Sequence, residues 1–454
     1  MAVVDLSTLV LGYSAQARPI YVVRSPGPLE APRVLILAGQ HGDETLAMEA
    51  VARLASAARH EPWADLEVSF VACLNPDGCA RGTRETAEGR DLNRDHLFLT
   101  TPEARTVHEF ARGFRPHLVI DVHTFKGRRR SMQALGGQHG SDVLLGWSNF
   151  SYEISDHGEA LVSRAIEVLE QDGLRAAKYF VFDDRGRPRT SSTDILDARN
   201  GLAASVNALG ILVEGREPTR ELGDEARTLG ALMSAVETLI QEWKAPTRSR
   251  RTDSRPATLA TDLRRGPPRV LKSWILPRGA GEPLPADIQV LADVLHRREI
   301  GIPPGYFVPR VQPVEEILAR HGYHPTDPPE DLDLELGRVM RAKASARRGE
   351  PWQRLRLSWE RESLDPRPTH AYYSTHQRRG AHLARLLEPS SRYGLHRRPE
   401  LGLPVVEGDR HAVYRIRESD ASFAPATESL VSPRRATSAP PDDMNTRSPK
   451  GTPS

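Results

Sequence analysis

The sequence predicts a three-layer α/β/α protein with a mostly parallel central sheet, and two observations support this prediction. Strand-like and helix-like segments alternate through the first half of the chain, which is typical of parallel sheets built from crossover units. The strand-like segments are also short and almost wholly apolar, as expected for strands covered by helices on both faces. Binding sites in such sheets form in loops beyond the carboxyl ends of the strands.

The segments follow one another in a regular order. Strands are predicted by apolar runs at residues 33–39, 66–74, 116–123 and 209–215. Helices are predicted where apolar residues recur at helical spacing, at residues 44–60, 101–114, 158–173 and 223–243. The helix at 101–114 opens with Thr-Pro-Glu, a common helix start. We therefore expect one α/β domain over residues 1–243.

The composition changes after residue 243. Residues 244–268 lose the periodicity and are rich in Pro, Arg, Ser and Thr, which predicts a linker. Residues 269–418 recover some pattern and form a C-terminal extension whose fold the pattern does not specify. Residues 419–454 are rich in Ser, Pro, Thr and Arg, and we expect them to be disordered.

The bulk composition excludes several classes of protein. Of the 454 residues, 39% are hydrophobic and 27% are charged, and no apolar run is long enough to span a membrane. The N-terminus lacks the basic start of a signal peptide, and the two cysteines cannot build a disulfide scaffold, so we expect a cytoplasmic protein. The basic clusters at 126–130 and 248–251 lack interleaved aromatics, so we expect no nucleic-acid partner. The sequence does not indicate the oligomeric state.

His41 and Glu44 lie three positions apart, directly after the first apolar strand. Two histidines and a glutamate are a standard ligand set for catalytic zinc, although a surface pair would give the same spacing. A second histidine, His123, ends the third apolar strand. A histidine there is often only a core residue, but strand ends meet at one edge of a parallel sheet. We therefore interpret these three residues as zinc ligands.

A zinc hydrolase also needs a general base and groups that stabilise negative charge. Glu214 ends a strand that is otherwise apolar, which favours the role of base, although it could instead cap the next helix or pair with Arg216. The loop at 75–96 contains several arginines, a residue suited to binding carboxylates and oxyanions. A solvated basic loop is the alternative interpretation.

Five motifs occur together in one order. They are HGDE at 41–44, NPDG at 75–78, the loop from RGTR at 81–84 to DLNR at 91–94, DVH at 121–123, and LVE at 212–214. In this order the chain resembles the zinc carboxypeptidases of the carboxypeptidase A superfamily over roughly residues 8–243. The resemblance implies hydrolysis of a C-terminal peptide bond in a substrate with a free carboxylate.

The resemblance also implies a role for each matching residue. It implies one zinc ion per chain, held by His41, Glu44 and His123, with Glu214 as the general base. It implies that Arg81, or alternatively Arg84, polarises the scissile carbonyl, and that Asn93 and Arg94 hold the terminal carboxylate of the substrate. Because the first motif begins almost at the N-terminus, we expect no zymogen activation.

Two departures keep other functions open. The substrate-capping tyrosine of the family is not found in residues 190–210, and Tyr179 lies too early in the chain. Asp95 also stands where many relatives have asparagine, and it either alters the carboxylate pocket or pairs with Arg94. The missing tyrosine favours an acylase resembling succinylglutamate desuccinylase and aspartoacylase, whereas the NPDG and RGTR motifs favour a carboxypeptidase. A non-catalytic zinc-binding protein is a further alternative, which the presence of Glu214 argues against.

Overall fold

The computed structural model describes most of the chain up to residue 417. The described residues are 7–127, 135, 137–148, 152–182, 186–190, 196–219, 224–243, 258–260, 264–265, 268–291, 293–294, 299–347, 350–377, 379–389, 391, 394–403, 405, 407–408 and 410–417.

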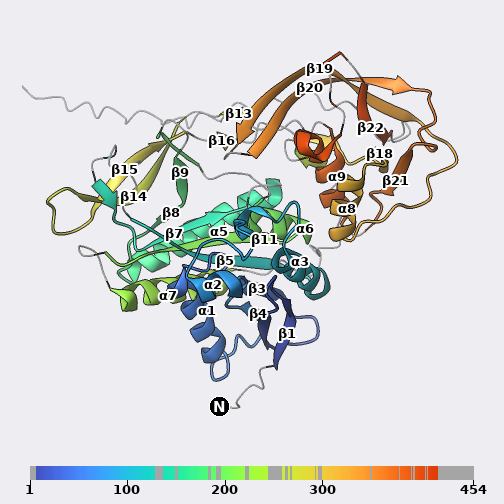
Figure 1. The fold of residues 1–454 in the computed structure, drawn as a ribbon. Coiled ribbons are helices and arrows are strands. Elements are labelled where there is room, and N and C mark those ends of the chain that lie inside the picture. Colours follow the sequence, from blue (N-terminus) through green and yellow to red (C-terminus); the bar gives the residue numbers. More distant parts are fainter. Residues whose placement is uncertain are drawn as a thin grey trace, which may run out of the picture. The chain divides into compact units, whose positions relative to one another are not determined.

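An eight-stranded sheet lies at the centre of the α/β part of the chain (Figure 1). In spatial order its strands are β1 (Ser7–Tyr13), β2 (Pro19–Ser25), β4 (Glu67–Val71), β3 (Arg33–Leu37), β5 (Leu118–Phe125), β11 (Leu209–Arg216), β7 (Val143–Trp147) and β8 (Ala176–Lys178). The four middle strands β4, β3, β5 and β11 are parallel to one another, so the predicted mostly parallel sheet is confirmed. The flanking strands were not predicted, because β1 is largely exposed and β8 has only three residues.

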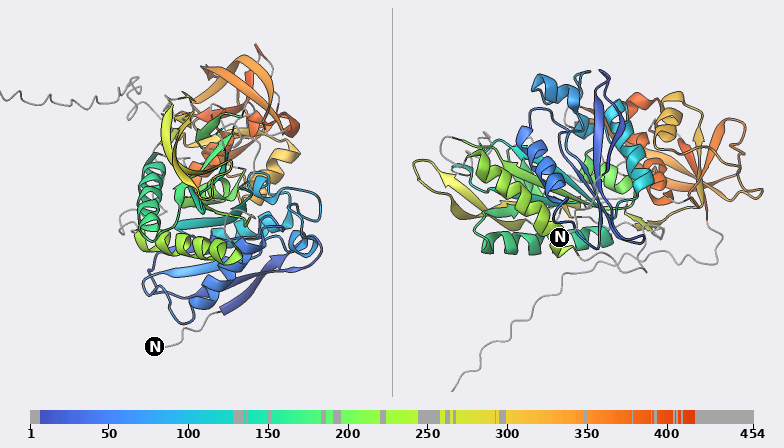
Figure 2. Two further views of the ribbon diagram at one scale, coloured as in Figure 1. Left: turned by 90° about the vertical axis from the view of Figure 1, so that its left-hand side faces the viewer. Right: turned by 90° about the horizontal axis from the view of Figure 1, so that it is seen from below.

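Helices cover both faces of this sheet, which confirms the three-layer prediction (Figure 2). On one face, three long helices pack against alternate strand residues such as Val34, Val122 and Val213. These helices are α1 (Thr45–Ala57), α5 (Tyr152–Gln171) and α7 (Glu225–Glu242). On the other face, Leu35 and Val119 pack against α3 (Pro102–Phe114), the π-helical turn η2 (Ala198–Leu202) and α6 (Ala203–Ser205).

Helix α3 begins at the predicted Thr-Pro-Glu signal. The side-chain oxygen of Thr101 accepts a hydrogen bond from the backbone N–H of Ala104 at 3.2 Å, which satisfies one of the donors left open at a helix start. Pro102 occupies the first turn, where its missing N–H costs nothing. Local sequence therefore determines where this helix starts.

The predicted extension forms two further sheets. In the first, β14 (Arg269–Pro277) lies between β15 (Leu284–Val290) and β6 (Gly137–His139). The second has the order β20 (Glu350–Glu362), β19 (Leu334–Arg347), β22 (Arg410–Ile416), β18 (Gly305–Pro309) and β21 (His370–Ser374). The remaining helical elements of this part are α8 (Gln312–Arg320), α9 (Gly380–Leu387), η3 (Leu395–Arg397) and η4 (Pro399–Leu401). Because β6 belongs to the α/β part and pairs with β14, the two parts share a sheet.

The predicted linker and tail lie mostly outside the described residues. This holds for the whole tail, 419–454, and for linker residues 244–257, 261–263 and 266–267. Within the linker, β12 (Thr258–Ala260) and β13 (Arg264–Arg265) pair with β17 (Glu299–Gly301) and β16 (Asp293–Val294). The remaining short elements are α2 (Pro76–Arg81), η1 (Leu92–Arg94), β9 (Phe180–Phe182) and β10 (Pro188–Thr190).

Both cysteines are free and half-buried. Burial, followed by the neighbouring Cys79 thiol, raises the pKa of the Cys73 thiol to about 12. Cys73 is therefore protonated at neutral pH and a weak nucleophile. Among the helices that the structure describes, none combines the length and the apolar character needed to cross a bilayer.

A buried carboxylate ties three segments together where β7 and β11 meet. Asp142 is 2% exposed. Its two oxygens accept hydrogen bonds from the guanidinium groups of Arg175, Arg216 and Arg227 at 2.7 to 3.1 Å. Burial alone would raise the pKa of Asp142, but the hydrogen bonds from Arg227 and Arg175 outweigh it and hold this pKa well below its usual range.

We expect Asp142→Asn to lower the free energy of unfolding by about 3–5 kcal/mol, as is typical when one partner of a buried ion pair is removed. Urea unfolding at pH 7 measures this loss. Because the pKa is lowered in the folded state, the stabilisation is present above the unfolded-state pKa and is lost as the pH falls towards the folded-state value. The exposed Asp172→Asn is the matched control, with an expected change within about 0.5 kcal/mol. Equal urea concentrations at the midpoint of unfolding for Asp142→Asn and Asp172→Asn would contradict the prediction.

Candidate metal centre

His41 and Glu44 lie in the turn that joins β3 to α1. This turn begins at Gly39, whose φ of +69° is a backbone conformation that favours glycine. A Cβ atom at Gly39 would also lie only 2.9 Å from the Cα of Cys73. Glu44 occupies the residue before α1, but its carboxylate does not cap that helix. The carboxylate is instead directed to the two histidines.

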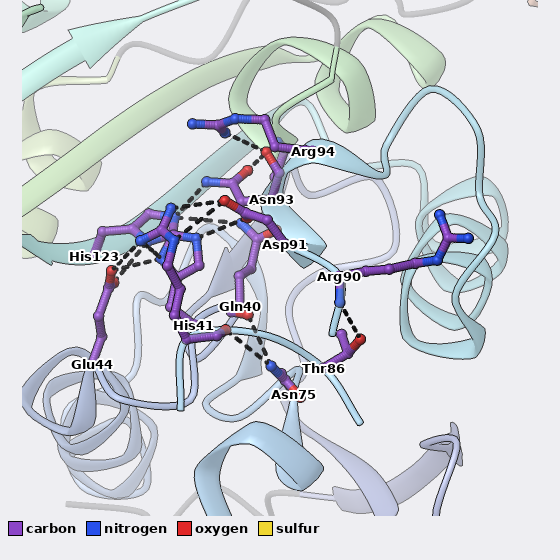
Figure 3. Close-up of polar contacts among 12 residues, drawn as sticks. Gln40, His41, Glu44, Asn75, Thr86, Arg90, Asp91, Asn93, Arg94 and His123 are labelled. Carbon is purple, nitrogen blue, oxygen red and sulfur yellow. Dashed lines mark hydrogen bonds and ion pairs between the residues drawn. The ribbon is translucent and has the colours of Figure 1, made fainter. Parts of the chain in front are cut away.

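The three predicted ligands converge at one point (Figure 3). Glu44 Oε1 lies 2.6 Å from His41 Nδ1, and Glu44 Oε2 lies 2.8 Å from His123 Nδ1. One ligand atom from each residue lies within 4.8 Å of the other two, and all three side chains are buried. In the part of the chain that the structure describes, this is the one such group of His, Cys, Asp and Glu.

This donor set fits a zinc ion. Metal-binding histidines usually present one ring nitrogen to the metal and the other to a carboxylate or carbonyl, which fixes the ring. Here both Nδ1 atoms face Glu44, while His41 Nε2 lies 3.2 Å from Asp91 Oδ1 and His123 Nε2 lies 3.1 Å from Asp121 Oδ1. Sequence analysis did not assign Asp91 or Asp121, although each lies within a quoted motif, DLNR or DVH.

Charge pairing dominates the electrostatics of this cluster. Burial opposes the charged form of His123, but the carboxylates of Asp121 and Glu44 outweigh it and raise its pKa well above the usual value. Burial would raise the pKa of Glu44, yet the charge and hydrogen bond of His123, together with His41, hold it well below its usual range. Without a metal ion, the two carboxylates therefore favour the charged, doubly protonated form of the His123 imidazole at neutral pH.

Zinc held by His123 through Nδ1 would have to displace the proton on that atom. We expect zinc binding at pH 7 to release a proton, and we expect affinity to weaken as the pH falls further below the raised pKa of His123. Isothermal titration calorimetry in two buffers with different ionisation enthalpies measures the number of protons released. Identical binding enthalpies in both buffers would contradict this expectation.

Glu214 lies on β11 directly beside His123. The two strands are parallel, and their register pairs Glu214 with His123. Residues paired in this way point to the same face of a sheet, with backbones roughly 4.8 Å apart. Glu214 is half-buried. The strand register thus places a carboxylate next to the candidate ligands, on the same face.

Of the two arginines considered for the scissile carbonyl, Arg84 lies beside the cluster. Arg84 Nη1 lies 3.2 Å from His41 Nδ1 and 3.7 Å from Glu44 Oε1. Its Nη2 donates to Asp91 Oδ2 at 3.0 Å, and its side chain is 40% exposed. Arg81 is exposed at the end of α2, where its Nη2 donates to the carbonyl of Thr86 at 2.6 Å.

The two residues expected to bind the substrate carboxylate lie on η1. Asn93 is buried, with Nδ2 3.0 Å from His123 Nε2 and Oδ1 accepting a hydrogen bond from the N–H of Ala198. Arg94 is half-buried, and its guanidinium donates to the carbonyl of Asn93 (Figure 3). Asp95 does not pair with Arg94, because its carboxylate accepts hydrogen bonds from the backbone and hydroxyl groups of Thr100 and Thr101. Asp95 thus orders the start of α3.

The chain is similar to known proteins over part of its length. Residues 30–143 match the family model of the succinylglutamate desuccinylase/aspartoacylase catalytic domain. Carboxypeptidase 2 of Trichophyton rubrum is 27% identical over 244 residues, which cover 48% of this chain and 44% of that protein. These matches support a place for the chain in the zinc carboxypeptidase superfamily.

The other similarities within the superfamily are shorter or more distant. Murein peptide amidase A of Escherichia coli K12 is 41% identical over 76 residues, covering 17% of this chain and 30% of that protein. The metallo-carboxypeptidase structure from Burkholderia cenocepacia is 18% identical with a TM-score of 0.39, covering 52% of this chain and 65% of that one. The chain spans about half the length of the fungal relatives that it matches.

Proposed function

We propose that the chain is a zinc metallocarboxypeptidase that hydrolyses the C-terminal peptide bond of its substrate. The observation that carries this proposal is the convergence of His41, Glu44 and His123, with Glu214 in register beside His123. Members of the superfamily are hydrolytic enzymes. The proposal adds the substrate, a peptide with a free carboxylate, and the role of each residue.

Each residue of this site has a defined task. Zinc, when bound, supplies Lewis acidity and lowers the pKa of water. Glu214 accepts a proton from the attacking water and delivers it to the leaving amine. Arg84, rather than Arg81, stabilises the developing negative charge on the carbonyl oxygen, because it lies beside the ligands and is partly exposed.

We assign the binding of the substrate's terminal carboxylate to Asn93 and Arg94. Both lie on one turn next to His123, and a cation together with an amide suits a carboxylate. In the described structure Arg94 Nη1 donates to the carbonyl of Asn93, and a guanidinium has further N–H donors that can bind a substrate carboxylate. We expect substrate affinity, more than turnover, to depend on Arg94.

A second candidate is an acylase that hydrolyses N-acyl amino acids. Two observations favour it: the match of residues 30–143 to the desuccinylase/aspartoacylase model, and the absence of tyrosine from residues 190–210. Such an enzyme would use the same ligands and the same base. The two candidates differ only in what lies on the acyl side of the scissile bond.

Mass spectrometry of reaction products separates these candidates. The zinc-loaded protein would be incubated with a peptide pool and with a set of N-acyl amino acids, using Glu214→Gln as the blank. We expect stepwise loss of C-terminal residues from peptides. Cleavage of acyl amino acids alone would establish the acylase. Because of the similarity to murein peptide amidase A, cell-wall peptides form the third pool, and no product from any pool would contradict both proposals.

A further inference from the structure

Behind the candidate metal centre, a chain of buried polar side chains leads away from His123. This chain includes Gln40, the residue directly before His41 (Figure 3). Gln40 Nε2 donates to Asp121 Oδ1 at 2.6 Å, and that oxygen lies 3.1 Å from His123 Nε2. Gln40 is fully buried and Asp121 is buried as deeply. The glutamine amide therefore contacts the carboxylate that faces a candidate metal ligand.

The other end of the Gln40 amide is held by histidines. Gln40 Oε1 lies 2.7 Å from His96 Nε2, and His96 Nδ1 lies 3.1 Å from His108 Nε2. An amide oxygen only accepts hydrogen bonds, so His96 Nε2 must carry a hydrogen. In a neutral His96, Nδ1 then accepts from His108. All donors thus point towards Asp121, and aligned hydrogen bonds of this kind strengthen one another.

This alignment requires His96 to be neutral, because a charged His96 would have no acceptor nitrogen for His108. Burial lowers the pKa of His96 and lowers that of His108 well below the usual value. The C-terminal part contacts the far end of this polar chain. The rings of His321, at the end of α8, and His108 meet at nearly right angles, and His321 Nε2 donates to the carbonyl of Leu97 at 2.9 Å. Leu97 itself packs into the hydrophobic core of the C-terminal part.

We propose that Gln40 is a positioning residue for the metal centre: held by His96, it fixes Asp121 and thereby the ring of His123. The inference rests on the proposed metal site but is independent of which bond the enzyme cleaves. It also gives the C-terminal part a role, since His321, directly after α8, contacts His108 at the far end of the polar chain. Outer partners of metal-binding histidines commonly contribute roughly 10- to 100-fold to metal affinity.

Cobalt substitution tests the proposal without any assay of activity. Co²⁺ would be titrated into the metal-free full-length protein, and the visible absorption spectrum would report both affinity and ligand geometry. We expect Gln40→Met, which keeps the size but loses both hydrogen bonds, to bind Co²⁺ roughly 10- to 100-fold more weakly and with a shifted spectrum. Gln353→Met is the control, because Gln353 is a half-buried glutamine whose Nε2 donates to the carbonyl of His396, outside the polar chain.

A second pair of variants keeps the test valid if Gln40→Met does not fold. His96→Gln can still donate to Gln40 through its own amide and should retain the parent affinity and spectrum, whereas His96→Met should not. Parental Co²⁺ affinity and spectrum in both methionine variants would overturn the inference. Failure of the parent protein to bind Co²⁺ would instead overturn the proposed metal site, and with it the inference.

Discussion

Glu214→Gln is expected to lower turnover by roughly 10³-fold, within the range that general-base catalysis contributes, while zinc binding stays close to that of the parent protein. Glutamine has nearly the same shape as glutamate but cannot accept a proton from water. The register beside His123 places Glu214 close to the ligand group, but Glu214 is not itself a member of it. The variant therefore separates the chemical step from metal binding.

Two measurements check this expectation. Turnover is measured on the substrate that mass spectrometry of the reaction products has identified. Zinc content is measured by atomic emission after gel filtration. Glu217→Gln is the matched control, since Glu217 lies three residues further on and accepts a hydrogen bond from Thr124 Oγ1 at 3.1 Å. Turnover in Glu214→Gln equal to that of the control would remove Glu214 from the role of base.

His123→Ala is expected to abolish stable zinc binding. The substitution removes one of the three proposed protein ligands of a single zinc ion. The loss of zinc affinity should therefore exceed the roughly 10- to 100-fold loss caused by removing a residue that only hydrogen-bonds to a ligand. The metal-free protein should lose stability as well. Glu44 and Asp121 are both buried and both pair with His123, so the substitution leaves two buried carboxylates close to each other without the positive charge between them.

Competition with a chromophoric chelator measures zinc affinity, and urea unfolding of the metal-free protein measures stability. The exposed His60→Ala is the control, because His60 lies just beyond the end of α1 and is not a member of the ligand group. One zinc ion per chain bound with parental affinity in His123→Ala would exclude this histidine from the ligand set. Circular dichroism establishes that the variant has folded.

Most of the fold follows from local patterns in the sequence. The strands β3, β4, β5 and β11 and the helices α1, α3, α5 and α7 lie where apolar runs and helical periodicity predict them. Parallel strands of this kind bring their carboxyl ends to one edge, so the sites of His41 and His123 are local consequences of where β3 and β5 end. The edge strand β1 lacked such a pattern because its side chains face solvent.

The sequence by itself therefore determined the class of fold, the three candidate ligands and the position of Glu214, since each depends on which residue follows or ends an apolar strand. Tertiary structure alone decided that Arg84 rather than Arg81 lies at the cluster and that Gln40 donates a hydrogen bond to Asp121. Arg84 and His41 are 43 positions apart, and Gln40 and Asp121 are 81 positions apart. The direction of a loop side chain depends on the partners that the folded chain brings to it, and periodicity within a segment carries no information about those partners.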